Sequence, residues 1–101
     1  MGCIYKHRAS ITAASGSVTS DTLKVSGGIC RQIVIRASSN GTVFRASIDD
    51  ENSVRVLDYP YHMEEINDWD IAIPMSGKQT INIANASSDD TFTILVQVEE
   101  V

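Results

Sequence analysis

Apolar and polar residues alternate with a period of two along several short segments of this chain. The alternation is clear in residues 4–13 and in residues 29–37, where Arg31 interrupts the apolar face. In residues 91–101 one face carries the apolar side chains Phe92, Ile94, Val96 and Val98. A two-residue period is typical of strands with one buried face. The pattern therefore predicts an all-β protein.

Turn-forming residues separate these segments. Asn40-Gly41 predicts a hairpin turn, from which the chain returns through residues 42–48 with Phe44, Ala46 and Ile48 facing the core. Further turns are expected at residues 14–17, 26–28, 49–53, 74–77 and 85–90, while residues 58–70 lose the period and predict a long connection. The spacing predicts seven to eight short strands in an antiparallel β-sandwich with jelly-roll or Greek-key connections.

The choice of aliphatic residues supports strands over helices. The chain contains 12 Ile and 9 Val against 3 Leu. β-Branched side chains suit a pleated sheet and crowd a helix. At 101 residues, we expect one domain spanning residues 1–101. No apolar stretch approaches the length that crosses a bilayer, so no membrane association is expected.

The N-terminus and the two cysteines indicate synthesis in a reducing compartment. The first eight residues lack the apolar core of a secretory signal. Lys6 stands where a myristoylation motif has Ser or Thr. Cys3 and Cys30 show no metal-binding or redox spacing, and we expect free thiols rather than a disulfide.

Charge is distributed unevenly between the two halves of the sequence. Residues 1–48 carry a formal charge of +5 and residues 49–101 a charge of -10. Either the strands of both halves interleave and the signs mix, or the molecule has a basic side and an acidic side that favours self-association or an acidic partner. Nucleic acid is not an expected partner, because the six basic residues of the first half are spread out, without a basic helix or a regular alternation with aromatic residues.

The sequence offers little chemistry for catalysis. His7 and His62 lie in no catalytic motif, and no Gly-x-Ser-x-Gly sequence occurs. We therefore expect no enzyme, no catalytic residue and no cofactor. The acidic turns at residues 49–52 and 89–90 have carboxylates suited to Ca²⁺, but a solvated turn is the simpler interpretation, so no metal site is predicted.

The aromatic segment at residues 59–69 holds the candidate interface residues. Tyr59, Tyr61, Met63 and Trp69 are flanked by acidic residues. Such side chains either cover one end of the core, anchor a protein partner, or stack on a sugar.

Parts of residues 27–98 resemble a known class of proteins. The segments at residues 27–35, 42–49 and 81–96 are similar to small β-sandwich virion proteins of tailed bacteriophages, above all capsid cement (decoration) proteins. The Asn85–Thr93 segment is also similar to the last hairpin of secreted pre-peptidase C-terminal-like and carbohydrate-binding sandwiches. Neither resemblance carries over a site residue.

The resemblance implies a non-enzymatic structural protein that binds and stabilises the major capsid shell. Its partners would be the major capsid protein and copies of itself in a homo-oligomer or multi-copy assembly, and its location would be the virion, after synthesis in the host cytoplasm. Three alternatives remain: a head-tail, tail or fibre component, a glycan-binding module using the aromatic segment, and a small intracellular interaction or inhibitor domain.

Overall fold

The computed structural model describes residues 4–100, which form seven strands and no helix. The strands are β1 (Ile4–Ala13), β2 (Val18–Ala37), β3 (Val43–Asp49), β4 (Arg55–Met63), β5 (Glu65–Asp68), β6 (Ile73–Ala84) and β7 (Asp90–Glu100). All pairings between them are antiparallel. The predicted all-β antiparallel class is confirmed. No helix in residues 4–100 is long and apolar enough to cross a membrane.

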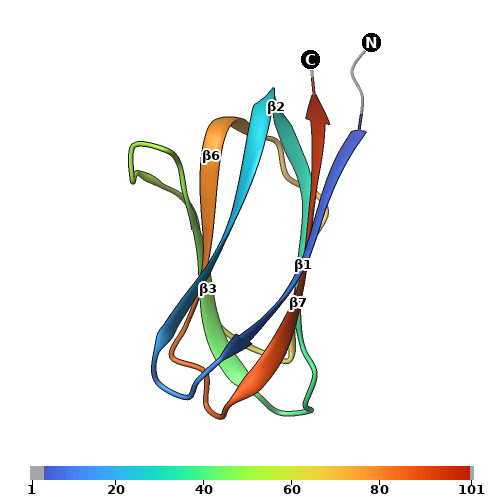
Figure 1. Ribbon diagram of the computed structural model, residues 1–101. Helices are drawn as coiled ribbons and strands as arrows, with labels where there is room; N and C mark the ends of the chain where they lie inside the picture. Colours follow the sequence, from blue (N-terminus) through green and yellow to red (C-terminus); the bar gives the residue numbers. More distant parts are fainter. Residues whose placement is uncertain (1–3, 101) are drawn as a thin grey trace.

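Hydrogen bonds join the strands in the order β1-β7-β2-β6-β3-β4, with β5 on the side of β2. The sheet folds over on itself because β2 bends after its first half. Residues 18–25 pair with β6, and residues 28–30 pair with β6 on one side and β7 on the other. Residues 32–37 pair with β7, and residues 33–36 also pair with β5. Figure 1 shows this bend beside the β2 label at the top of the molecule. The bend creates two layers, here called the β1 layer (β1, β7, residues 28–37 and β5) and the β6 layer (residues 18–25, β6, β3 and β4).

Glycines permit this corner. Gly27 has a φ of 149° and Gly77, which lies opposite Val25 on β6, has a φ of 78°. L-residues rarely adopt these conformations, and strands commonly change sheets at such bends. Gly28 is needed at the corner for lack of space and not for its backbone conformation. A Cβ atom there would lie 2.8 Å from Cα of Glu100 on β7.

The core lies between the two layers. Phe44 of β3 and Phe92 of β7 meet edge to face with ring centroids 4.8 Å apart, although their strands are not neighbours in the sheet. Both are fully buried, and the predicted inward residues of β7 are buried as well. The inner residues of β1 other than Ala13 are only half-buried, since β1 is an edge strand. The apolar period thus identified the core faces of β1, β3 and β7 correctly.

Arg31 marks a register shift in β2. The pairing with β7 shifts between Cys30 and Gln32, which leaves Arg31 as an extra residue. Cys30 and Ile33 are both fully buried despite an odd separation. A bulge explains this, because one extra residue restores the alternation on the same face.

Two predicted turns are wrong, since the chain remains in a strand there. Residues 26–28 form the corner inside β2, and residues 74–77 lie inside β6. Gly and Pro at these positions bend paired strands instead of ending them.

The predicted hairpin at Asn40-Gly41 is also wrong. The turn is present and Gly41 has a φ of 83°, but β2 and β3 do not pair with each other. The loop carries the chain from the β1 layer to the β6 layer. A crossing of this kind differs from a hairpin only in that the two flanking strands pair with other strands and not with each other.

The predicted long connection at residues 58–70 is wrong as well, because most of it forms β4 and β5. A register shift in the β3–β4 pairing places Pro60 and Tyr61 opposite Arg45 alone. This bulge, together with the exposure of an edge strand, destroys the two-residue period that would have identified β4.

Polar contacts close both open sides of the sandwich. On one side His7 Nε2 of β1 lies 2.6 Å from Asp21 Oδ2 of β2. On the other side the Tyr59 hydroxyl of β4 donates to Asp68 Oδ2 of β5 at 3.0 Å. Each contact joins the edge strand of one layer to the edge of the other.

We expect Tyr59→Phe to lower the free energy of unfolding by about 1 kcal/mol, because it removes the bond to Asp68 and leaves the ring in place. Tyr61→Phe is the matched control. Among residues 4–100, only Asn85 Nδ2 reaches the Tyr61 hydroxyl, at 3.4 Å, so a loss of unfolding free energy below about 0.5 kcal/mol is expected. Urea denaturation measures both, and equal losses would contradict a closing role for Tyr59.

Candidate functional site

The two charged halves of the sequence interleave in the fold. Three arginines of the first half form ion pairs with carboxylates of the second half, at nitrogen-to-oxygen distances of 3.1, 2.8 and 3.6 Å. These pairs are Arg31–Glu99, Arg36–Glu65 and Arg45–Asp58. Of the two expected arrangements, the structure thus mixes the signs at these strands. All three pairs are exposed, so each adds little to stability.

Tyr59 and Tyr61 point to opposite sides of β4, although they are two residues apart. Tyr59 is 9% exposed, and burial followed by the bond to Asp68 raises its pKa. Tyr61 is 57% exposed, and the guanidinium carbon of Arg45 lies 5.7 Å from its ring centroid. The bulge at Pro60 and Tyr61 separates them. Tyr59 is therefore part of the packed interior, whereas Tyr61 is accessible.

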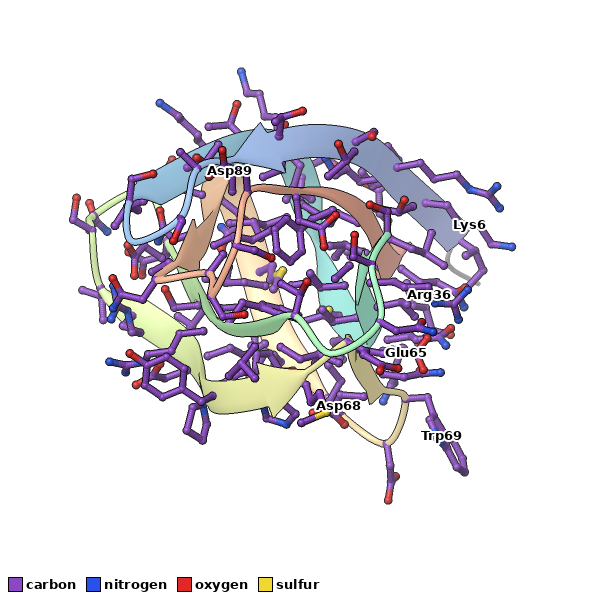
Figure 2. All side chains as sticks on the ribbon, turned by 90° about the horizontal axis from the view of Figure 1, so that it is seen from below. Lys6, Arg36, Glu65, Asp68, Trp69 and Asp89 are labelled. Atoms are coloured by element: carbon purple, nitrogen blue, oxygen red, sulfur yellow. The ribbon has the colours of Figure 1, made fainter. Side chains whose placement is uncertain are left out.

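Met63 and Trp69 are the other exposed members of the predicted set. Met63 ends β4 and is 64% exposed, while Trp69 follows β5 and is 73% exposed. Figure 2 shows Trp69 directed away from the body of the sandwich, beyond Asp68. Large apolar side chains this exposed are favourable anchors for a partner.

A shallow hollow of about 290 Å³ lies on the outer face of the β6 layer, next to Tyr61. Its polar lining contains side chains of both charges and comes from three strands, β3, β4 and β6. These residues are Arg45, Ser47, Asp49, Arg55, Asp58 and Asn82. Arg55 Nε donates to Asp49 Oδ1 at 3.1 Å, and Asn82 Nδ2 donates to Asp49 Oδ2 at 3.0 Å. Two guanidinium groups and two carboxylates balance in charge. The hollow thus offers both donors and acceptors to a neutral polar ligand.

Sequence reasoning did not find this hollow. Arg45, Ser47 and Asp49 stand at every second position of β3, which indicates one polar face. Their convergence with Asn82 and Arg55 depends on the neighbours of β3, and a single sequence does not specify those neighbours.

The acidic turns have structural roles in the described chain. Asp50 Oδ1 accepts hydrogen bonds from the backbone N–H groups of Asn52 and Val54, both at 2.9 Å. Asp90 binds hydroxyl groups, as described below. Within residues 4–100, no group of three or more His, Cys, Asp or Glu side chains is placed to hold a metal ion.

Neither histidine contacts a serine, threonine or cysteine side chain in residues 4–100. His7 contacts Asp21, and His62 Nδ1 lies 2.6 Å from the carbonyl oxygen of Pro60. Burial raises the pKa of the Cys30 thiol to about 11, which suppresses the reactive thiolate. Cys30 is a free thiol, whereas Cys3 lies outside the described residues, so the expectation of a free thiol is untested at Cys3.

No protein-family model matches this chain, and no curated protein matches it. Among solved structures, it is similar to a chain of particles described as infectious bursal virus-derived T=1 particles, with 12% identity and a TM-score of 0.38. It is also similar to chains of the Gx and Gt strains of infectious bursal disease virus, each at 11% identity, with TM-scores of 0.39 and 0.35.

These alignments cover 97–98% of this chain and 33–36% of the viral chains. The chain therefore spans about a third of the length of the viral proteins it matches. Similarity of this degree assigns no family. The class defined by strand pairing is an all-β antiparallel sandwich with a closed core and an exposed aromatic and polar outer surface.

Proposed function

We propose that this chain is a non-enzymatic structural virion protein of a tailed bacteriophage, a capsid cement protein that binds and stabilises the major capsid shell. The strand pairing is the observation that carries the proposal. Counting β2 as two strands gives β1-β7-β2-β5 in one layer and β2-β6-β3-β4 in the other. This is the order of a jelly roll, an architecture frequent in viral capsid domains. The sequence resemblance of residues 27–98 supports the phage cement class.

The use of the polar residues also supports a structural role. Asp21, Asp68 and Asp90 each hold two strands or loops together, and the two histidines contact a carboxylate and a backbone carbonyl. A protein whose polar side chains fix its shape is suited to a multi-copy assembly.

Tyr61, Met63 and Trp69 form the proposed contact with the major capsid protein. We expect Trp69→Ala, and separately the pair Tyr61→Ala with Met63→Ala, to weaken binding to shells at least tenfold. Val54→Ala is the matched control, because Val54 is 56% exposed but lies on the β3–β4 turn. Co-sedimentation of purified variants with shells lacking this protein measures the affinity. Unchanged binding of both variants would contradict this surface.

Mass spectrometry of sedimented DNA-containing particles from the native source tests the function itself. Hundreds of copies per particle would support a cement role, and a few to a few tens would indicate a head-tail or tail component. Absence from such particles would overturn the virion proposal.

Glycan binding is the second candidate, favoured by the charge-balanced hollow beside Tyr61. Carboxylate, amide and guanidinium groups next to an aromatic ring match the hydroxyls and apolar faces of a neutral sugar. A glycan array would reveal binding that Asn82→Ala abolishes. An array with no bound glycan would remove this candidate.

A further inference from the structure

The outer edge of β1 is the longest regular free edge in the described chain. β1 pairs with β7 through ten consecutive residues without a register shift, and no strand in residues 4–100 pairs with its other side. An unpaired edge presents a row of N–H and C=O groups that can accept another strand.

The edges at the opposite side of the sandwich are protected by comparison. β4 carries the bulge at Pro60 and Tyr61, and β5 has only four residues. Bulges, prolines, short length and charged side chains are the usual means of blunting an edge. β1 contains no proline and no bulge, and its only such protection on the outer face of the described strand is Lys6 and Arg8. Residues 18–25 of β2 also have a free edge on the same side of the sandwich as β1. This edge is shorter than that of β1, and it ends at the register shift between Val25 and Gly28.

We propose that β1 pairs with β1 of a second copy of this chain, antiparallel about a two-fold axis at Ala9. Such an axis keeps the outer faces of both copies on the same side of the joined sheet. The numbers of two facing residues then add up to 18. Residues 5–13 then form a continuous ladder. This inference deepens the proposed function, because assembly in multiple copies is part of that proposal.

The charges of the outer face exclude registers centred on His7 or Arg8 and permit the one centred on Ala9. Lys6, Arg8, Ser10 and Thr12 are all exposed on that face, and Figure 2 shows Lys6 pointing away from the sandwich. Centred on Ala9, Lys6 faces Thr12 of the second copy and Arg8 faces Ser10. Centring on Arg8 would oppose two arginines, and centring on His7 would oppose Lys6 to Arg8. Directly opposed like charges destabilise a strand pair.

The inner face is complementary in the same register. Tyr5 meets Ala13, His7 meets Ile11, and Ala9 meets itself, so large side chains face small or apolar ones. Centring on Ser10 also avoids opposed cations, but it shortens the ladder to residues 7–13 and leaves Tyr5 without a partner.

Analytical ultracentrifugation of the purified chain tests the pairing. We expect a dimer with a Kd at or below about 100 µM. Ser10→Arg should raise the Kd at least tenfold, because it opposes two arginines across the new ladder. Ser76→Arg on β6, also an exposed serine, is the matched control and should leave the Kd unchanged. A monomer at all concentrations, or a dimer that resists Ser10→Arg, would overturn the inference.

Cysteine trapping tests the register. In a Cys3→Ser background, Ala9→Cys should form an interchain disulfide on oxidation, since only the residue on the axis faces itself. Thr12→Cys faces Lys6 of the second copy and should not. The reverse result would exclude this register. If the chain stays monomeric while Ser10→Arg abolishes shell binding, the edge accepts a strand of another protein, so the second copy is excluded while the virion proposal stands.

Discussion

Gly28→Ala is expected to lower the free energy of unfolding by about 3 kcal/mol, the upper range for an overpacked interior. The corner of β2 brings Gly28 against the backbone of β7. A Cβ atom would lie 2.8 Å from Cα of Glu100 and closer still to the carbonyl oxygen of Glu99. Both obstacles are backbone atoms of a paired strand, so neither can rotate away. For a domain of this size the midpoint of thermal unfolding should fall by roughly 15 °C.

Gly41→Ala provides the control for this prediction. Gly41 has a φ of 83° but nothing lies within 4 Å of its Cβ position, whereas Gly28 is not among the positive-φ residues. The control should therefore cost only the conformational strain of about 1 kcal/mol. Thermal unfolding of both variants by circular dichroism decides the point. If Gly28→Ala lowers the unfolding midpoint no more than Gly41→Ala does, the two layers must separate easily at the corner.

Asp90→Ala is expected to lower the free energy of unfolding by about 3 kcal/mol, because a buried carboxylate holds two loops together. Its Oδ2 accepts from the Thr42 hydroxyl at 2.8 Å and from the Ser39 N–H at 3.2 Å. Its Oδ1 accepts from the Ser38 hydroxyl and from the Thr91 N–H. Without Asp90, the buried Thr42 hydroxyl loses its strongest partner.

Acid should remove the contribution of Asp90. The hydrogen bond from Ser38, followed by those from Thr42 and the backbone, lowers the Asp90 pKa from 3.8 to about 2. A carboxylate with a lowered pKa in the folded state stabilises the fold at pH values above its unfolded pKa. Protonation removes this stabilisation as the pH falls from about 5 through 2.

Urea denaturation of the wild type and Asp90→Asn between pH 7 and pH 2 measures this dependence. The difference in unfolding free energy between the two proteins should be largest near pH 7 and should shrink below pH 4. Asp89→Asn is the matched control, because Asp89 accepts one exposed bond from the Ser15 N–H. A difference that stays constant with pH would contradict the assignment.

The candidate site shows how far sequence reasoning reached. Aromatic side chains at positions 59–69 were identified as interface candidates, and Trp69 and Tyr61 are indeed exposed. Their even spacing would place Tyr59 and Tyr61 on the same face of a regular strand. The bulge at Pro60 separates them and buries Tyr59. The polar hollow was missed entirely, since Arg45, Arg55 and Asn82 come from three different strands.

The sequence by itself determined the fold class and the inner face of β1, β3 and β7. That information is local, because a strand with one buried face must place apolar residues at every second position. Tertiary structure alone decided that Gly27 and Gly28 turn a corner inside β2, that Asn40-Gly41 crosses between layers, and that the charged halves interleave. Each of these depends on which distant strand supplies the hydrogen-bond partners, and that choice is set by the packing of the whole core.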